Sequence, residues 1–225
     1  MNTTPFTAEK YNSGIREIIP YYEVINQEVI DLVQLMKPTC KNRLDAGCGT
    51  GYLISKAVKI FPKSYFYMCD PANDMITIAK NTLAELIPDQ WHLIQSTTQD
   101  LEISKLPTMD VITAVLTHHF CTKEERKEAT KKVFDLLEEG GIYVTVEIFK
   151  PRSPESINIA LKRWAQWELK NWRDEESVKE HMSRYGTKTF PITIDEHLEL
   201  LKNSGFKTYD IFRLSNTQAC FYAIK

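Results

Sequence analysis

The sequence predicts an α/β fold, in which a doubly wound, parallel sheet carries helices on both faces. Three features of the 225 residues predict it. Strand-like and helix-like runs alternate five times between residues 21 and 149, as expected of parallel strands joined by right-handed crossovers. A glycine-rich turn follows the first strand. A long helical stretch then interrupts the alternation after the fifth strand.

In the first half of the chain, the spacing of apolar residues switches between helical and extended periods. The helical runs are 21–36, which Pro38 ends, 52–60 and 73–86. Between and after them, residues 43–46, 65–69 and 91–95 are short β-prone runs. This order predicts the first three strands and their crossover helices.

The second half continues the pattern and ends with two strands. Residues 110–117 are apolar on both faces, as in a central parallel strand. Thr122 and Glu125 form a capping box for a helix over 123–138, which Gly140 and Gly141 should end before a fifth strand over 142–149. A second capping box, Thr193 with Glu196, should start a last helix that stops at Gly205. The closing strands, 206–213 and 218–224, are close enough in sequence to be antiparallel to each other.

The helical stretch over 153–185 is longer than a crossover needs. Ser153 suits its N-cap and Pro154 its first helical position. We therefore predict an inserted helical cap over 151–190 within a single domain, 1–225. Its aromatic residues should mainly form core, with one or two left open as lining for a substrate pocket; they are Trp164, Trp167, Trp172 and Tyr185.

The composition bounds the function. The net charge is -2 and acids and bases are interspersed, so the sequence predicts no basic surface that would bind nucleic acid or an anionic membrane. The first residues lack the basic and apolar regions of a signal peptide, and no apolar run reaches the length of a membrane span. The five scattered cysteines fit free thiols in a reducing compartment. We therefore predict a cytoplasmic protein.

The turn LDAGCGTG carries the first sign of a ligand. Gly47, Gly49 and Gly51 remove β-carbons where a strand meets a helix N-terminus, so that a ligand can approach the backbone. Asp70, at the end of the second strand, lies 25 positions after Asp45, the spacing of a ribose-binding acid. The sequence therefore predicts an adenosine-containing cofactor at the carboxyl edge of the sheet.

The spacing of the glycines favours one cofactor over another. A dinucleotide fingerprint is G-x-G-x-x-G, whereas here the third glycine comes one residue early. A G-x-G-x-G turn preceded by an acid suits S-adenosylmethionine, which has no phosphates. A nicotinamide-dependent oxidoreductase and a non-catalytic cofactor-binding protein remain as alternatives.

The segments LDAGCGTG, YMCDP, TAVLTHHF and LLEEGGIYVTVE resemble the class I S-adenosylmethionine-dependent methyltransferases. The resemblance implies a Rossmann-like, seven-stranded sheet whose last strand is antiparallel, with N-terminal helices over 1–38 covering the cofactor. It also implies a set of cofactor-binding residues. These are Asp45, Gly47, Gly49 and Gly51 at the methionine end, Asp70 with Pro71 at the ribose, Thr97, Thr98 and Gln99 at the adenine, and Tyr11 as a covering aromatic residue.

A narrower resemblance concerns IIPYYEVI, VEIF and NTQACFYAIK, which are similar to the carboxy-S-adenosylmethionine synthase group. Tyr22 would match a cofactor-contacting tyrosine of that group. This chain keeps the full glycine triplet, from which that group departs, and has Val115 where that group has a polar residue. We therefore expect a methyltransferase and keep the synthase as an alternative.

Four polar residues at the ends of the fourth and fifth strands should face the cofactor: Thr117, His118, His119 and Glu147. Methyl transfer from a sulfonium mainly needs alignment, and a base helps where the acceptor carries a proton. His118, His119 and Glu147 are therefore the candidate catalytic residues, with Thr117 at the cofactor. Neighbouring residues on a strand point opposite ways, so only one histidine should face the substrate. We expect no metal, a small-molecule acceptor, and leave a homodimer open.

Overall fold

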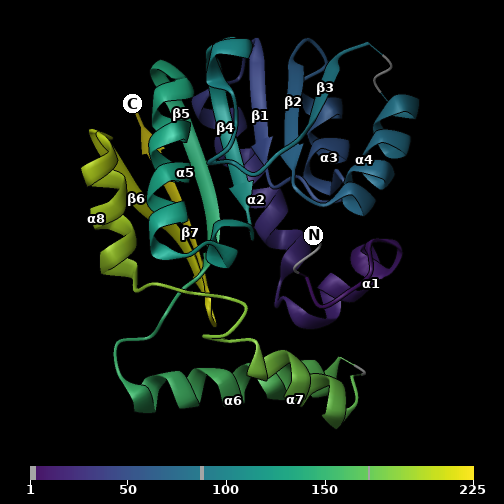
Figure 1. Ribbon diagram of the computed structural model, residues 1–225, viewed down its shortest axis with the longest axis vertical. Coiled ribbons are helices and arrows are strands. Elements are labelled where there is room, and N and C mark those ends of the chain that lie inside the picture. The colour runs from purple at the N-terminus through teal and green to yellow at the C-terminus, as the bar shows by residue number, and fades with distance from the viewer. Residues whose placement is uncertain (1–3, 87–88, 172) are drawn as a thin grey trace.

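The computed structural model describes residues 4–86, 89–171 and 173–225, and within these residues seven strands form one sheet. Their order across the sheet is β3-β2-β1-β4-β5-β7-β6 (Figure 1). The strands are β1 (Asn42–Ala46), β2 (Tyr65–Asp70), β3 (Trp91–Gln95), β4 (Met109–Val115), β5 (Leu137–Ile148), β6 (Thr208–Ser215) and β7 (Gln218–Ile224).

The strand directions match the predicted topology. β1 pairs in parallel with β2 and β4, and the parallel pairing extends outward to β3 and β5. β7 runs antiparallel to both of its neighbours, β5 and β6. The expected seven-stranded sheet with an antiparallel last strand is confirmed. The chain reverses its winding between β1 and β4, so a crevice opens where their carboxyl ends diverge.

Helices cover both faces of the sheet because the central strands are apolar on both sides. On β4, Val111 packs in the core under α2 and α3, whereas the next residue, Ile112, packs in the core under α5 and α8. The helices of the two layers are α2 (Tyr22–Met36), α3 (Tyr52–Ile60), α4 (Asn73–Leu86), α5 (Lys123–Leu136) and α8 (Ile194–Ser204). Two 3-10 turns, η1 (Ile103–Lys105) and η2 (His118–Phe120), complete the connections.

Three further helices lie beyond the carboxyl ends of the strands. In Figure 1, α1 (Ala8–Ile18) lies close to α6 (Pro154–Lys170) and α7 (Glu175–Ser183) below the sheet. The prediction of one helix over 153–185 was wrong. α6 ends at Lys170, and Asp174 starts a new helix because its carboxylate accepts the backbone N–H of Ser177.

The end of α5 also differs from the prediction. The helix stops at Leu136 and β5 starts at Leu137, so Gly140 and Gly141 lie inside the strand. The pairing of β4 with β5 shifts register between Met109 and Val111, and Gly140 has φ +72 beside this irregularity. Glycine there serves a strand irregularity and not a helix end. The capping boxes at Thr122 and Thr193 are confirmed, as is Ser153 as an N-cap.

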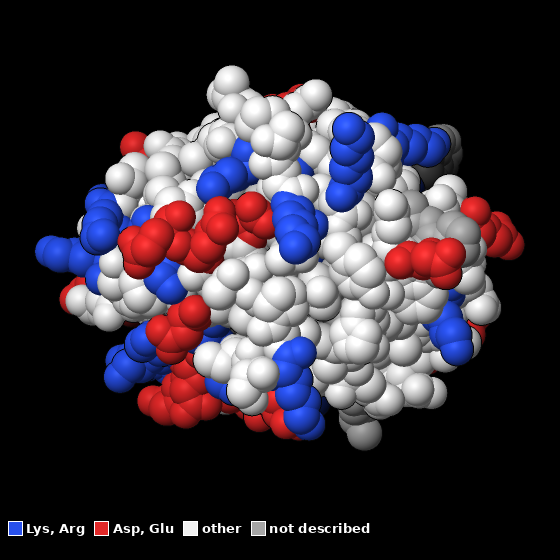
Figure 2. All heavy atoms as spheres, turned by 90° about the horizontal axis from the view of Figure 1, so that it is seen from above, with Lys and Arg blue, Asp and Glu red and all other residues white. Residues whose placement is uncertain are grey.

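The end of the molecule opposite α6 and α7 carries no large patch of one charge. Figure 2 shows this end, with lysine and arginine side chains interspersed among acids and uncharged residues. Across the residues that the structure describes, no helix combines the length and the apolar character needed to cross a membrane.

Candidate active site

A cavity of about 310 Å³ lies at the carboxyl ends of the first four strands. This volume is at the lower end of the range for small-molecule sites. Many of the residues that the sequence singled out line it, from five separate parts of the chain. These are Tyr11, Gly47, Gly49, Asp70, Pro71, Thr97, Thr98, Gln99, Thr117 and His118.

The glycine turn brings bare backbone to this cavity. Gly47 and Gly49 have φ +72 and φ +53, values that residues with a β-carbon rarely adopt. A β-carbon on Gly47 would lie 2.0 Å from the hydroxyl oxygen of Thr117, so only glycine lets the ends of β1 and β4 approach this closely. At Gly49 a β-carbon would meet only the ring of Tyr11, at 3.9 Å, which leaves that backbone open to a ligand.

Asp70 ends β2 with its carboxylate fixed by the backbone. Oδ2 accepts the N–H of Gly49 at 2.9 Å, and Oδ1 accepts the N–H of Ala72 at 2.9 Å. Burial raises the pKa of this carboxyl, and the two backbone hydrogen bonds oppose that rise. Each oxygen keeps a further lone pair, so the carboxylate can still accept hydrogen bonds from a diol in the cavity.

Three predicted cofactor residues do not line the cavity. Asp45 is buried in the sheet, where its Oδ1 accepts the hydroxyl of Thr113 at 2.7 Å and burial raises its pKa to about 7. Gly51 starts α3 with φ +79. Tyr22 packs against Tyr52 in the core, with ring centroids 5.3 Å apart. Asp45 on β1 and Tyr22 at the start of α2 bury their side chains in the core, and Gly51 is the N-cap of α3, so none of the three lines the cavity.

His118 and His119 lie on the 3-10 turn η2 and not on a strand end, yet they face different spaces. His118 lines the cavity with both ring nitrogens engaged, Nδ1 to the hydroxyl of Tyr143 and Nε2 to that of Thr98, each at 3.0 Å. Burial lowers the pKa of His118 to about 4, so the ring is neutral near pH 7. This geometry suits a residue that positions the loop after β3 better than it suits a base.

His119 lies instead beside Glu147, which comes from β5. His119 Nδ1 is 3.4 Å from Glu147 Oε2, and both side chains are almost fully buried. Burial acts to raise the pKa of Glu147, but the contact with His119 outweighs it and lowers that pKa to about 2. The His119 ring also lines a recess of about 30 Å³ that shares four residues with the larger cavity: Thr4, Tyr11, Leu116 and Phe120.

Sequence reasoning did not find several lining residues. Leu116 follows β4 with φ +56, a strained backbone for a branched side chain, Phe120 ends η2, and Cys121 follows it. Their position within or directly after the segment TAVLTHHF was a usable signal. Thr4 had none, because only the folding of α1 across the carboxyl ends brings it to the cavity.

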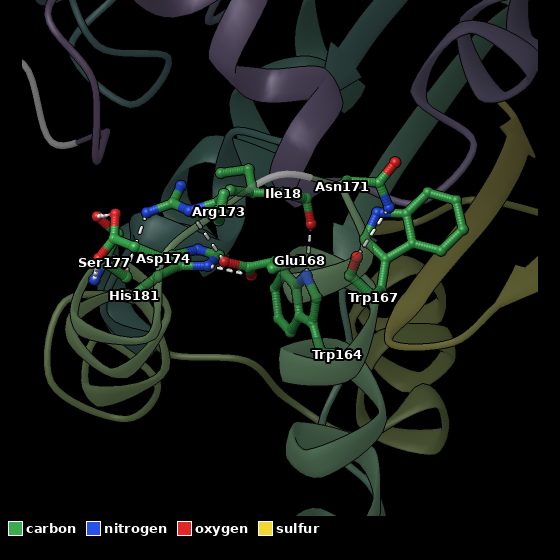
Figure 3. A network of polar contacts seen from close by, with 9 residues as sticks. All are labelled: Ile18, Trp164, Trp167, Glu168, Asn171, Arg173, Asp174, Ser177 and His181. Carbon is green, nitrogen blue, oxygen red and sulfur yellow. Dashed lines mark hydrogen bonds and ion pairs between the residues drawn. The ribbon is translucent and has the colours of Figure 1, made fainter.

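The segment that carries α6 and α7, predicted above to be a cap, is joined to α1 through buried polar contacts (Figure 3). Glu168 on α6 is fully buried, with His181 Nδ1 at 2.5 Å and Arg173 Nε at 3.4 Å from its carboxylate. The indole of Trp164 donates to the carbonyl of Ile18, the last residue of α1, at 2.5 Å. His181 also lines the recess, so the cap forms part of its wall. Of the predicted cap aromatics, Trp172 lies outside the described residues.

Comparisons with known proteins show what the chain is similar to. Residues 44–143 match the model of a family described as a methyltransferase domain. A carboxy-S-adenosyl-L-methionine synthase of Staphylococcus epidermidis is 26% identical over 100% of both chains. Two solved methyltransferases share the fold at low identity. The magnesium protoporphyrin IX methyltransferase of Synechocystis is 13% identical with a TM-score of 0.66, covering 93% of this chain and 86% of its own. The plantazolicin methyltransferase is 16% identical with a TM-score of 0.69, covering 97% and 89%.

The matched family segment runs from the start of the glycine turn to β5 and so contains most of the cavity wall. The sheet order with one reversed strand, the turn with its three glycines, and the relatives agree with one another. Residues 44–143 therefore match a methyltransferase domain, and the whole chain is similar to proteins with the class I S-adenosylmethionine-dependent methyltransferase fold.

Proposed function

We propose that the protein binds S-adenosylmethionine in the 310 Å³ cavity and transfers its methyl group to a small molecule. The observation that carries the proposal is the pairing of the open Gly49 backbone with the fixed Asp70 carboxylate in one cavity. Asp70, next to Pro71, would accept the ribose hydroxyls. The glycine turn, Tyr11 and Thr117 would surround the methionine end.

The loop after β3 would hold the adenine. Thr97, Thr98 and Gln99 line the cavity there, and the bond from Thr98 to His118 fixes the loop against the end of β4. Asp45, Gly51 and Tyr22 would act from behind by holding the turn and α1 in place. The protein's part in the reaction is then to align acceptor and sulfonium and to exclude water.

Calorimetry tests the cofactor directly. Titration with S-adenosylmethionine and with S-adenosylhomocysteine should give saturable binding of one molecule per chain. Titration with NADH should give no binding, because the third glycine of the turn is not at the position that a dinucleotide fingerprint requires. If neither S-adenosylmethionine nor S-adenosylhomocysteine gave a heat of binding, the proposal would be refuted.

A second candidate is the transfer that makes a carboxylated cofactor. Full-length similarity to the Staphylococcus epidermidis synthase favours it. Against it, none of the described residues that line the cavity is a lysine or an arginine, the side chains that best hold a carboxylate. A mass spectrum of the ligand retained through purification separates the two. The synthase predicts a cofactor heavier by one carbon dioxide, and the methyltransferase predicts S-adenosylmethionine or its demethylated product.

Replacing Asp70 by asparagine should weaken the binding of S-adenosylhomocysteine by about 100-fold, through the loss of charge-assisted hydrogen bonds to the ribose. The amide can accept only one of the N–H groups of Gly49 and Ala72, so the variant should also lose about 1–3 kcal/mol of stability. Calorimetry and urea unfolding measure the two effects. Asp89→Asn, at an exposed site, is the control and should change neither. Equal affinities for the two variants would exclude Asp70 as the ribose ligand.

The proposals on compartment and assembly are separate from the reaction. The five cysteines are free thiols, which suits the cytoplasm.

A homodimer would use exposed apolar side chains such as Val24 and Leu35 on α2, and sedimentation would detect it. The interspersed charges of the sequence support a small-molecule acceptor over nucleic acid.

A further inference from the structure

We propose that His119, held by Glu147, is the general base of the methyl transfer, and that the acceptor is a small, mainly apolar molecule with a reactive hydroxyl. This inference rests on the proposed function, since it takes the cofactor to lie in the larger cavity. It adds the side of the site that receives the acceptor, and it chooses between the two adjacent histidines.

The pair has the arrangement of a base and its orienting acid. Glu147 Oε1 accepts the hydroxyl of Thr145 at 2.8 Å, which fixes the carboxylate. Its other oxygen, Oε2, is buried without a hydrogen-bond partner and faces the equally unpartnered Nδ1 of His119 at 3.4 Å. A small approach of the ring would satisfy both atoms. The arrangement favours the tautomer with its proton on Nδ1, which leaves a lone pair on Nε2.

The pair lies next to the cofactor cavity rather than in a closed core. The His119 ring lines the recess, and Leu116 and Phe120 belong to the walls of both the recess and the cavity. Phe120 packs on the His119 ring, with centroids 4.4 Å apart. A base at this point can reach an acceptor that meets the methyl group from the larger cavity.

The recess determines the class of acceptor. Its walls combine apolar side chains, such as Ile15 and Ile148, with the polar group of His119, so they suit a hydroxyl attached to an apolar group. Its volume of about 30 Å³ takes a group on the order of one water molecule in size. A hydroxyl carried on an apolar body fits, with the hydroxyl at His119 and the body against Leu116 and Phe120, which the recess shares with the cofactor cavity.

The proposed step balances with the groups named. The hydroxyl oxygen of the acceptor attacks the methyl carbon, the carbon–sulfur bond breaks, and its electron pair stays on sulfur to give S-adenosylhomocysteine. The hydroxyl proton passes to Nε2 of His119, and the ionised carboxylate of Glu147 stabilises the imidazolium that forms. The proton then leaves to water. His118 cannot take this part while hydroxyl groups engage both of its ring nitrogens.

Several charged or titratable groups surround the pair, among them Tyr143 on β5 and Cys121 after η2. Arg126 on α5 donates to the carbonyl of His118, and His197 on α8 lies in the space behind Glu147. His181 and Arg184 of the cap, together with Tyr11 of α1, line the recess. Glu147 is the one carboxylate among these groups, so its charge is what should stabilise a protonated His119.

The test uses radiolabelled S-adenosylmethionine with phenol as the acceptor probe and anisole, which lacks the proton, as its matched control compound. The variants are His119→Gln and Glu147→Gln, with His92→Gln, an exposed histidine on β3, as control. S-adenosylhomocysteine affinity is measured for each. We expect wild type and His92→Gln to methylate phenol but not anisole. His119→Gln should lose about 100-fold or more of the rate while its affinity for S-adenosylhomocysteine stays within about threefold.

Glu147 acts through His119, so its variant needs a second measurement. Glu147→Gln should lower the rate while affinity for S-adenosylhomocysteine stays within about threefold, and Glu147→Asp, which keeps the carboxylate, should restore part of the rate. Normal S-adenosylhomocysteine binding by the wild type with no methylation of phenol would overturn the inference. So would a His119→Gln rate close to that of the wild type. If the wild type did not bind S-adenosylhomocysteine, the proposed function itself would be overturned.

Discussion

Replacing Gly47 by alanine should destabilise the protein by about 2–5 kcal/mol, measured by urea unfolding. Two costs add. The left-handed backbone at φ +72 costs a residue with a β-carbon about 1–2 kcal/mol. The new carbon would lie 2.0 Å from the Oγ1 and 2.5 Å from the Cβ of Thr117, so the end of β4 must shift, which costs about 1–3 kcal/mol more.

The matched control is Gly140→Ala in β5. Gly140 has the same φ of +72, but a β-carbon there would meet nothing within 4 Å. It should therefore lose only the backbone term, about 1–2 kcal/mol. The difference between the two variants isolates the contact between the glycine turn and Thr117. Equal losses would mean that β4 and the turn are not held together as the structure has them.

The fold could be predicted because its signals are local and repeated. β4 is mainly apolar on both faces, and Thr122 with Glu125 marks the start of α5 within four residues of sequence. Such features depend on propensity and capping, which neighbouring residues determine. Right-handed crossovers then limit how such alternating strands and helices can be arranged.

The predictions were wrong where one local sequence signal is compatible with two different structures. Gly140 and Gly141 suit a helix end, but pairing of Leu137 with Met109 extends β5 back to the end of α5. Asp174 falls within the single helix predicted over 153–185, yet it caps α7, and the turn before it brings His181 to Glu168. In both places a contact with a distant segment decided the structure.

Some features of the candidate site could likewise be predicted from local motifs, whereas others depend on distant residues. Asp70 and the glycines follow from motif spacing, and the structure places Asp70, Gly47 and Gly49 around one cavity. The separate environments of His118 and His119 did not follow from the sequence. They depend on hydroxyl groups of Thr98 and Tyr143 and on the carboxylate of Glu147, which lie 20 to 28 positions away along the chain.

Acid should destabilise the protein through two buried histidines. Burial lowers the pKa of His118 and of His197 to about 4, from 6.5. Each ring stays neutral in the folded protein while the unfolded chain takes up a proton below pH 6.5. Stability is therefore lost as the pH falls from 6.5 to 4, by about 3 kcal/mol for each histidine.

A third group works against this loss. Burial raises the pKa of Asp45 to about 7 from 3.8, so the folded state holds a proton that the unfolded chain releases. Its contribution to stability grows as the pH falls from 7 to 3.8. The wild type should therefore lose less than the two histidines would remove together, and its pH profile alone cannot assign the loss to a residue.

A variant of His197 resolves the assignment. His197 stacks on Phe221, with centroids 4.1 Å apart, and its Nε2 is buried without a hydrogen-bond partner. In His197→Phe a ring of similar shape keeps the stacking but cannot take up a proton. Between pH 7 and pH 4, measured by urea unfolding, the variant should lose about 3 kcal/mol less than the wild type. His92→Gln, at an exposed site, should follow the wild type, and a parallel profile for His197→Phe would mean that His197 is not buried in its neutral form.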